Sequence, residues 1–279
     1  MSKPPQKRFA DLPPGAENPL NFAISQQDQK TLSMVNSAVL HRQTLMAYQP
    51  VMRAAAPDKV AFYEGFIRVL DANGRVIPAA DFMPAVEDAE LGRQIDTLAL
   101  RMGLRALHQN PGLRLALNMS ARSIGYRKWH DTLHRNLKRD PTVGERLILE
   151  ITEQSAMMVP ELVIGFMQEL HPHGVCFALD DFGAGYTAIK YFKDFDFDIL
   201  KIDGQFVKEV AQTPDNRVMV AALLSIAQHF DMLTVAEAVE TAQDAALLTS
   251  MGLDCLQGHY FATPTTQPPW ARKRRARAG

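Results

Sequence analysis

The sequence predicts an α/β fold, a modified TIM (β/α)8 barrel with an irregular, partly antiparallel start. Short apolar runs recur at intervals of roughly 20 to 35 residues, with helix-like patterns between several of them, which is the rhythm of repeated βα units. The first two runs instead have the pattern of a hairpin. A length of 279 residues and a hydrophobic content of 47% suit one large barrel.

The predicted elements follow the chain in order. Strands over 45–52 and 60–70 are joined by a turn around Pro57-Asp58. Helices are expected over 88–109, 214–230 and 241–251, where apolar residues recur at helical spacing or where capping patterns mark the ends. Further apolar runs predict strands, which cover 113–118, 147–153, 175–181, 199–203 and 233–237.

The two ends of the chain differ from this pattern. Residues 1–30 contain a cluster of prolines and predict a flexible N-terminal arm. Residues 31–268 form the predicted barrel. Residues 269–279 are rich in arginine, and we expect them to form a basic, disordered tail.

Composition limits the partners. With 30 basic against 31 acidic residues, the chain has no overall charge bias toward nucleic acid or membranes, and we expect no sequence-specific nucleic-acid binding. No apolar run is long enough for a membrane span, and no signal sequence is recognisable. Cys176 and Cys255 fall in predicted strands as buried, reduced thiols, so a cytoplasmic protein is expected.

Polar residues stand where the predicted strands end. The stretch 175–186 is a continuous apolar run followed by Asp180, Asp181 and a Gly-x-Gly loop. Other strands end in Asn118, Glu150 and Glu237. A lone Asp-Asp-x-Gly would fit a solvated turn, but the strand ends of a (β/α)8 barrel converge on one face. Repetition therefore favours a site for hard cations.

Three charged residues in apolar strands, one acid and two cations, each allow two interpretations. Glu64 and Arg68 are the charges of the run 60–70, and they form either a buried ion pair or a metal ligand with a phosphate-binding arginine. Lys201 either pairs with Asp203 or faces the site, and its position among apolar neighbours favours the site.

An ordered set of motifs makes the chain resemble the EAL-domain phosphodiesterases, the family that hydrolyses cyclic di-GMP (c-di-GMP). The resemblance covers roughly residues 40 to 265. Its motifs are Tyr48-Gln49-Pro50, Glu64-Gly65-Phe66-Ile67-Arg68, Leu117-Asn118-Met119-Ser120, Glu150-Ile151-Thr152-Glu153, Asp180-Asp181-Phe182-Gly183, Lys201-Ile202-Asp203, Ala236-Glu237-Ala238-Val239-Glu240 and Gln257-Gly258. Gly65 and Phe66 depart from the family's Ala and Leu, which puts substrate fit and rate in doubt more than metal binding.

The resemblance implies a set of roles. Two divalent cations, Mg²⁺ or Mn²⁺, would be bound by Glu64, Asn118, Glu150, Asp180, Asp181 and Glu237. Lys201, Glu237 and Glu64 would be catalytic, and the product would be linear pGpG. Substrate binding would fall to Arg68, Gln49, Asp203, Glu240 and Gln257. Glu153 would steady the loop after Asp181, and a homodimer is possible.

Two other function classes are compatible with the resemblance. The chain could be a receptor that binds c-di-GMP without turnover, or an interaction module that has lost the ligand. Neither class requires six metal ligands and Lys201, because crowded carboxylates are unfavourable without cations. The enzyme is therefore the preferred hypothesis.

Overall fold

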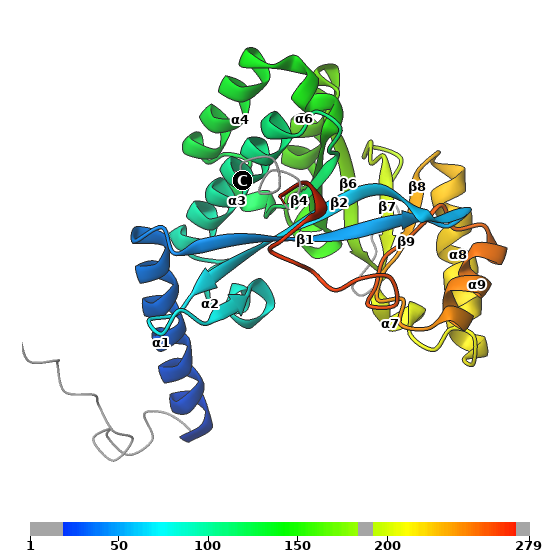
Figure 1. Cartoon of the computed structure of the whole chain (residues 1–279), viewed down its shortest axis with the longest axis horizontal. Coiled ribbons are helices and arrows are strands. Elements are labelled where there is room, and N and C mark those ends of the chain that lie inside the picture. The colour runs from blue at the N-terminus through cyan, green and yellow to red at the C-terminus, as the bar shows by residue number, and fades with distance from the viewer. Residues whose placement is uncertain (1–18, 184–191, 272–279) are drawn as a thin grey trace, which may run out of the picture.

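The computed structural model describes residues 19–183 and 192–271. Within these residues, eight strands close into a barrel with helices around it, which confirms the predicted fold class (Figure 1). The strands are β1 (Thr44–Arg53), β2 (Ala56–Leu70), β3 (Val76–Pro78), β4 (Leu115–Asn118), β5 (Leu147–Thr152), β6 (Cys176–Phe182), β7 (Ile199–Ile202), β8 (Leu233–Ala236) and β9 (Cys255–Leu256).

The strand order explains the irregular start. The described sheet runs β1-β9-β8-β7-β6-β5-β4-β2-β3, and β1 also pairs with β2, so β3 alone lies outside the ring. β1 is antiparallel to both of its neighbours, β2 and β9. From β2 through β4 to β9 the ring is parallel, so the carboxyl ends of these strands meet at one face.

Helices lie around the strands, with α3, α4 and α6 on one side and α8 and α9 on the other (Figure 1). Their bounds are α1 (Pro19–Leu40), α2 (Met83–Val86), α3 (Glu90–Gln109), α4 (Arg127–Arg139), α5 (Glu153–Met158), α6 (Pro160–Leu170), α7 (Gly204–Val207), α8 (Pro214–His229) and α9 (Ala242–Met251). The helices predicted over 88–109, 214–230 and 241–251 are confirmed as α3, α8 and α9. None of the described helices is both long and apolar enough to cross a membrane.

The hairpin turns earlier than predicted. The strands predicted over 45–52 and 60–70 are present, but the turn lies at Ala54-Ala55 and not at Pro57-Asp58. The pairing jumps from Met52↔Val60 to Arg53↔Ala56, so Pro57 and Asp58 fall in an irregular part of β2. Proline has no N–H to donate to a neighbouring strand, and a bulge tolerates it where a regular ladder does not.

Both ends of the predicted barrel need correction. Residues 19–30, which were assigned to the flexible arm, form the first part of α1, with Pro19 at the first helical position where its missing N–H is harmless. Trp270, which was assigned to the disordered tail, packs edge-on against Tyr48 and Tyr63 at centroid distances of 5.1 and 4.7 Å. Residues 1–18 and 272–279 of the predicted arm and tail lie outside the described residues.

The barrel closes at a short seam. Only Met52↔Leu256 and Arg53↔Cys255 pair across β1 and β9, and an isolated bridge joins Tyr48 to Thr265 beyond them. Trp270 covers the outside of this bridge through its contact with Tyr48. The seam thus joins the first barrel strand to the last.

A small apolar cluster fills the inside of the barrel. It takes one buried residue from each of the eight strands: Val51, Phe62, Ala116, Ile148, Ala178, Ile199, Val235 and Cys255. A larger core, which includes Trp129, Phe166 and Phe177, packs the helices against the outside of the strands. The inner cluster forms the floor on which the polar residues described next are placed.

Candidate functional site

Every barrel strand places one polar residue above the apolar floor. Side chains two positions apart on a strand lie on the same face, so the residue two beyond each floor residue also points inward. β1 runs antiparallel, and its polar residue therefore precedes its floor residue by two. The resulting layer consists of Gln49, Glu64, Asn118, Glu150, Asp180, Lys201, Glu237 and Gln257. All eight are residues that the sequence analysis assigned to the site.

Lys201 lies at the centre of this layer. Its ammonium is fully buried and lies 3.3 Å from Glu64 Oε2 and 3.1 Å from Glu150 Oε2. It also lies 2.9 Å from Asp180 Oδ1 and 2.7 Å from Glu237 Oε1. The structure thus supports the site position of Lys201 over an ion pair with Asp203.

Two amides orient Glu64. Asn118 Nδ2 donates to Glu64 Oε1 at 2.7 Å, and Gln257 Nε2 donates to Glu64 Oε2 at 2.8 Å. Gln257 Nε2 also donates to Gln49 Oε1 at 3.2 Å, and Gln49 Nε2 in turn donates to the Ala262 carbonyl at 2.9 Å. Because both Glu64 oxygens accept hydrogen bonds, the carboxylate has one defined orientation in the buried layer.

Asp181 reaches the site only because the strand breaks its regular geometry. Adjacent strand residues normally point to opposite faces, yet oxygens of Asp180, Asp181 and Glu237 lie within 4.8 Å of one another. Asp181 has a φ of 55°, in the left-handed region, and the β6–β7 register shifts between Leu179 and Phe182. This local distortion turns two consecutive carboxylates toward the same place.

Glu153 supports the segment that follows. Its Oε2 accepts a hydrogen bond from the Gly183 backbone N–H at 3.0 Å, directly after the Asp180-Asp181 pair. Gly183 has a φ of 95°, which glycine adopts without strain. The contact agrees with the loop-supporting position expected for Glu153, while Gly185 and Tyr186 lie outside the described residues.

The protonation of the cluster follows from crowding in a buried place. Burial, reinforced by Asp180, raises the pKa of Glu237 to about 8, and burial with the charges of Asp180 and Asp203 raises the pKa of Asp181 to about 6. Burial alone would lower the pKa of Lys201, but the four surrounding carboxylates outweigh it and raise that pKa. The cluster therefore retains protons that a bound cation would displace.

The residues fit divalent cations. Glu64, Glu150 and Asp180 form one compact group of carboxylate oxygens, and Asp180, Asp181 and Glu237 form a second, so Asp180 belongs to both. Glu150 Oε1 is buried and accepts no hydrogen bond from the described residues. When the protons of the cluster are displaced, the five carboxylates and the Lys201 ammonium carry four net negative charges, which two divalent cations would balance. Oxygen donors of this kind suit Mg²⁺ or Mn²⁺.

Comparison with known proteins identifies the family and the fold of the chain. The family model of the EAL domain matches residues 33–264, most of the chain. The chain belongs to the EAL domain family. The structures it resembles include the PaMucR phosphodiesterase in complex with c-di-GMP, with a TM-score of 0.76 and 29% identity over 85% of this chain and 97% of that chain.

Curated EAL relatives are longer proteins. The chain is 28% identical over 247 residues to the bifunctional diguanylate cyclase/cyclic di-GMP phosphodiesterase MucR of Pseudomonas aeruginosa, covering 87% of this chain and 36% of MucR. It is 29% identical over 248 residues to the probable cyclic di-GMP phosphodiesterase PdeA of Escherichia coli, covering 86% of this chain and 34% of PdeA. The chain thus spans roughly a third of the length of these relatives.

A second solved structure agrees in fold. The FimX EAL domain of Pseudomonas aeruginosa, bound to c-di-GMP, has a TM-score of 0.77 and 23% identity over 85% of this chain and 96% of that chain. At this identity the likeness concerns the barrel itself.

Three residues assigned to substrate binding lie outside the central layer of this EAL domain. Arg68 is half-buried, donates to the Ile67 carbonyl at 3.1 Å and stacks over the Phe66 ring, 5.4 Å from its centroid. Asp203 caps α7 by accepting from the Gln205 backbone N–H at 2.7 Å. Glu240 is exposed and lies 3.6 Å from Lys208 Nζ.

The departure at Gly65 has a packing reason in this EAL domain. A Cβ at Gly65 would lie 3.0 Å from Leu117 Cδ2 and 3.1 Å from Met46 Sδ. These neighbours occupy the space that the family's alanine would need, so the change at position 65 is matched by its surroundings.

One supporting residue was not singled out in the sequence. Asp96 of α3 is buried, and its Oδ2 accepts from Ser123 Oγ at 2.6 Å and from the Ser120 N–H at 3.1 Å. These bonds hold the segment directly after Asn118, and burial raises the pKa of Asp96 to about 6. The available signal was an acid next to Ile95, on the apolar face of a predicted helix.

Proposed function

We propose that this protein hydrolyses c-di-GMP to linear pGpG and requires two divalent cations, Mg²⁺ or Mn²⁺. The observation that carries the proposal is the pair of carboxylate groups that share Asp180 above the floor of the barrel. The c-di-GMP phosphodiesterases among the relatives point to the same substrate.

The residues of the site would have distinct roles in the reaction. When bound to Glu64, Asn118, Glu150, Asp180, Asp181 and Glu237, the two cations would activate water and offset charge at the phosphate in the transition state. The Lys201 ammonium would hold the surrounding carboxylates together. Its contact with Glu237 Oε1 would orient that carboxylate, which is more exposed to solvent than the others that Lys201 contacts. Glu64, held by two amides, would enter the reaction preorganised.

Arg68 is proposed to bind a phosphate of the substrate. It lies four residues beyond Glu64 on β2, and its one hydrogen bond within residues 19–183 and 192–271 leaves further N–H donors for a ligand. The Phe66 ring supports the guanidinium plane from one side. Gln49, Asp203, Glu240 and Gln257 are proposed to complete the nucleotide-binding surroundings.

Hydrolysis and metal dependence can be tested together. Purified protein is incubated with c-di-GMP in Mg²⁺, in Mn²⁺ and in EDTA, and the product is identified by chromatography. We expect pGpG with either metal, none in EDTA, and a loss of most turnover in Glu64→Gln and Asp181→Asn. Glu161→Gln, which removes an acid of α6 outside the cluster, is the matched control and should behave like the parent.

Two outcomes would contradict the proposal. Folded Glu64→Gln or Asp181→Asn with near-parental turnover would remove these residues from the site. Binding of c-di-GMP without pGpG in either metal would instead identify a receptor.

A further inference from the structure

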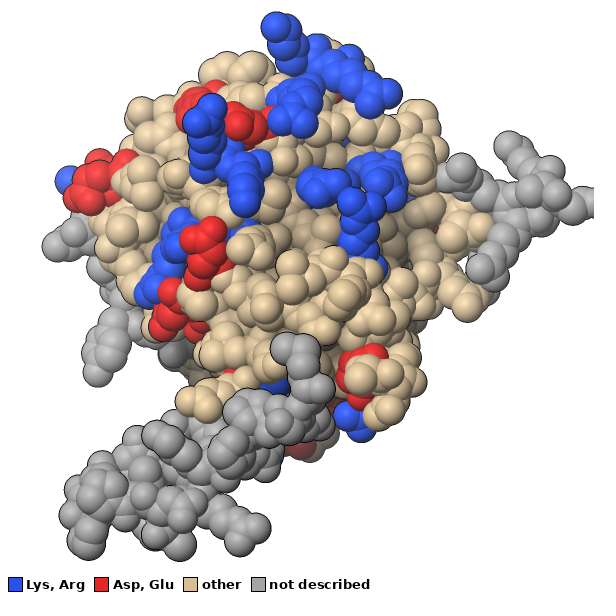
Figure 2. Space-filling view, turned by 90° about the vertical axis from the view of Figure 1, so that its left-hand side faces the viewer, with Lys and Arg blue, Asp and Glu red and all other residues tan. Residues whose placement is uncertain are grey.

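A basic groove runs along the outside of the barrel between α3 and α4. It encloses about 840 Å³ and is lined by five cations, Arg101, Arg105, Lys128, Arg135 and Arg139. Figure 2 shows Lys and Arg side chains gathered on the face that carries these helices. The groove is separate from the carboxylate layer, which lies at the carboxyl ends of the strands.

Each of the two helices carries its groove cations on one face. Arg101 and Arg105 are four residues apart on α3, and Lys128, Arg135 and Arg139 follow at intervals of seven and four on α4. These spacings place the residues of each helix on one face. At the rise of an α-helix, the lining from Lys128 to Arg139 extends for about 16 Å.

The charge of the groove is not compensated. All five cations are exposed, and none forms an ion pair with another residue of 19–183 or 192–271. Asp131 is the acid of the lining, and it is engaged by Arg127 at 3.6 Å. In a chain with 31 acidic and 30 basic residues, this local excess is a property of the groove and not of the composition.

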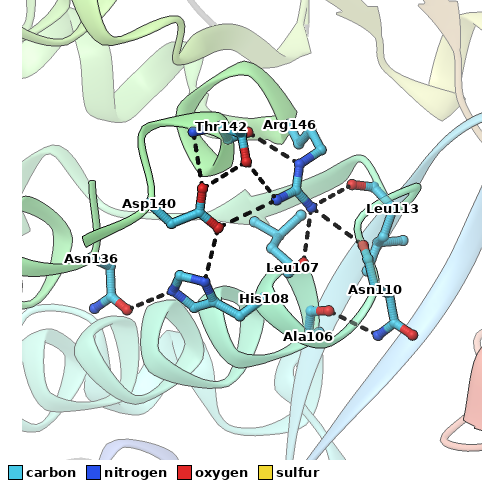
Figure 3. Close-up of polar contacts among 9 residues, drawn as sticks. All are labelled: Ala106, Leu107, His108, Asn110, Leu113, Asn136, Asp140, Thr142 and Arg146. Carbon is cyan, nitrogen blue, oxygen red and sulfur yellow. Dashed lines mark hydrogen bonds and ion pairs between the residues drawn. The ribbon is translucent and has the colours of Figure 1, made fainter. Parts of the chain in front are cut away.

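Asp140, the residue that follows α4, is held by an internal network. Asp140 Oδ1 accepts from the N–H and the hydroxyl of Thr142, and its Oδ2 lies 3.3 Å from His108 Nδ1 (Figure 3). Arg146 lies 4.0 Å from the same Oδ2 and donates to the Leu107 carbonyl at 2.9 Å. The network ties the end of α3 to the end of α4, and Asp140 forms no ion pair with any of the five groove cations.

Helix stability explains only part of the pattern. Arg139 lies in the last turn of α4, where a cation is favourable for the helix dipole. Arg101 and Arg105 lie in the interior of α3 and Arg135 lies one turn earlier on α4, where the dipole contributes little. Like charges that face each other across a groove repel, so an anion is the natural complement.

We propose that the groove binds a chain of phosphates, as in inorganic polyphosphate or the polyphosphate tail of a nucleotide. Guanidinium groups on both walls suit phosphate oxygens, which they bind through paired N–H donors. The hydroxyls of Thr97 and Thr132 already donate to the carbonyls of Arg93 and Lys128, at 2.8 and 2.7 Å. Asn136 Nδ2 donates one N–H to the Thr132 carbonyl at 2.7 Å and keeps a second for a ligand, so the five cations supply most of the donors. Apart from His108 the lining has no aromatic ring, so it lacks the stacking surface with which proteins bind single-stranded nucleic acid.

Calorimetry on the full chain tests the proposal. Tripolyphosphate, orthophosphate, GTP and a short single-stranded RNA are titrated in metal-free buffer at about 0.1 M salt, where screening is moderate. We expect tripolyphosphate to bind at least about tenfold more tightly than orthophosphate, and the double variant R101Q/R135Q to lose about tenfold in affinity. GTP that binds like tripolyphosphate would show that the phosphate chain alone is recognised, and tighter GTP binding would identify a nucleotide as the source.

Matched variants separate a site from general charge. Lys128→Gln and Lys138→Gln remove the same charge from α4, but only Lys128 lines the groove. We expect weaker tripolyphosphate binding in the first and parental binding in the second, with c-di-GMP turnover unchanged in both. Unchanged binding in R101Q/R135Q, an equal loss in Lys138→Gln, or a preference for RNA over tripolyphosphate would each overturn the proposal.

Discussion

Replacing Lys201 by methionine should destabilise the protein strongly without metal and much less with it. Methionine keeps an unbranched chain of similar length but removes the buried charge that contacts Glu64, Glu150, Asp180 and Glu237. The four carboxylates would then lie close together without a cation. Two divalent ions would supply the missing positive charge at the same place.

The size of the effect follows from burial. Removing one partner of a buried ion pair costs about 3 to 5 kcal/mol, because the remaining charge is left without compensation. For a domain of this size, that corresponds to a fall in Tm of roughly 10 °C. Lys208→Met is the matched control: its contact with Glu240 is exposed on both sides, and its loss should cost less than about 1 kcal/mol.

The measurement is chemical denaturation of parent, Lys201→Met and Lys208→Met, each in EDTA and in saturating Mn²⁺. We expect the difference between parent and Lys201→Met to shrink by at least about half in Mn²⁺, since bound cations take over the charge compensation. Equal differences in EDTA and Mn²⁺ would show that the cations do not enter this cluster. A Lys201→Met protein as stable as the parent in EDTA would refute the electrostatic argument itself.

Three further predictions concern pH, substrate and barrel closure. The folded-state pKa values of Glu237, about 8, and Asp181, about 6, exceed the ordinary values of these carboxyl groups. Between the ordinary pKa and the folded-state pKa of each group, the folded protein therefore binds more protons than the unfolded one. Their contribution is therefore present at low pH and is lost as pH rises; denaturation in EDTA should show lower stability at about pH 8 than at about pH 5.5, and metal affinity, measured by titration, should rise over the same interval. Arg68→Ala should weaken c-di-GMP binding in Ca²⁺, measured by calorimetry, whereas Lys201→Ala should chiefly slow single-turnover hydrolysis; unchanged affinity or an unchanged chemical step would refute the corresponding half. Trp270→Ala should lower the free energy of unfolding by about 1 to 3 kcal/mol and Trp270→Phe by less, because two ring contacts are lost or only reduced; identical denaturation curves would exclude the contribution of Trp270 to the seam.

Much of the layer could be predicted because it depends on local rules. Alternation along a strand and the convergence of strand ends are sufficient to bring Asn118, Glu150 and Lys201 together once the barrel is assumed. Asp181 is different, since alternation alone points it away from Asp180. Only the left-handed backbone at Asp181 and the shifted register with β7 bring both carboxylates to one place.

Features that depend on distant contacts were missed. Trp270 directly precedes an arginine-rich segment, so in the sequence it falls in the predicted tail. Its role becomes visible only in the fold, where its ring contacts Tyr48 and Tyr63. The groove cations were likewise not recognised. Arg101 and Arg135 belong to separate helices, and the periodicity of each helix does not show that the two helices lie side by side. Composition even conceals the groove, since the charges of the whole chain nearly cancel.

The seam between β1 and β9 sets the order in which the protein can assemble. β1 leaves the ribosome before every other strand of the barrel, but its partner across the seam, at Cys255 and Leu256 of β9, follows all the other strands. Gln257, the next residue, donates to Glu64 on β2, so a proposed ligand on the second strand gains its final orientation only after the ninth strand has been made. A nascent chain that has made every strand up to β8 therefore holds its carboxylates in an open sheet, and cation affinity should arise in a single late step of folding.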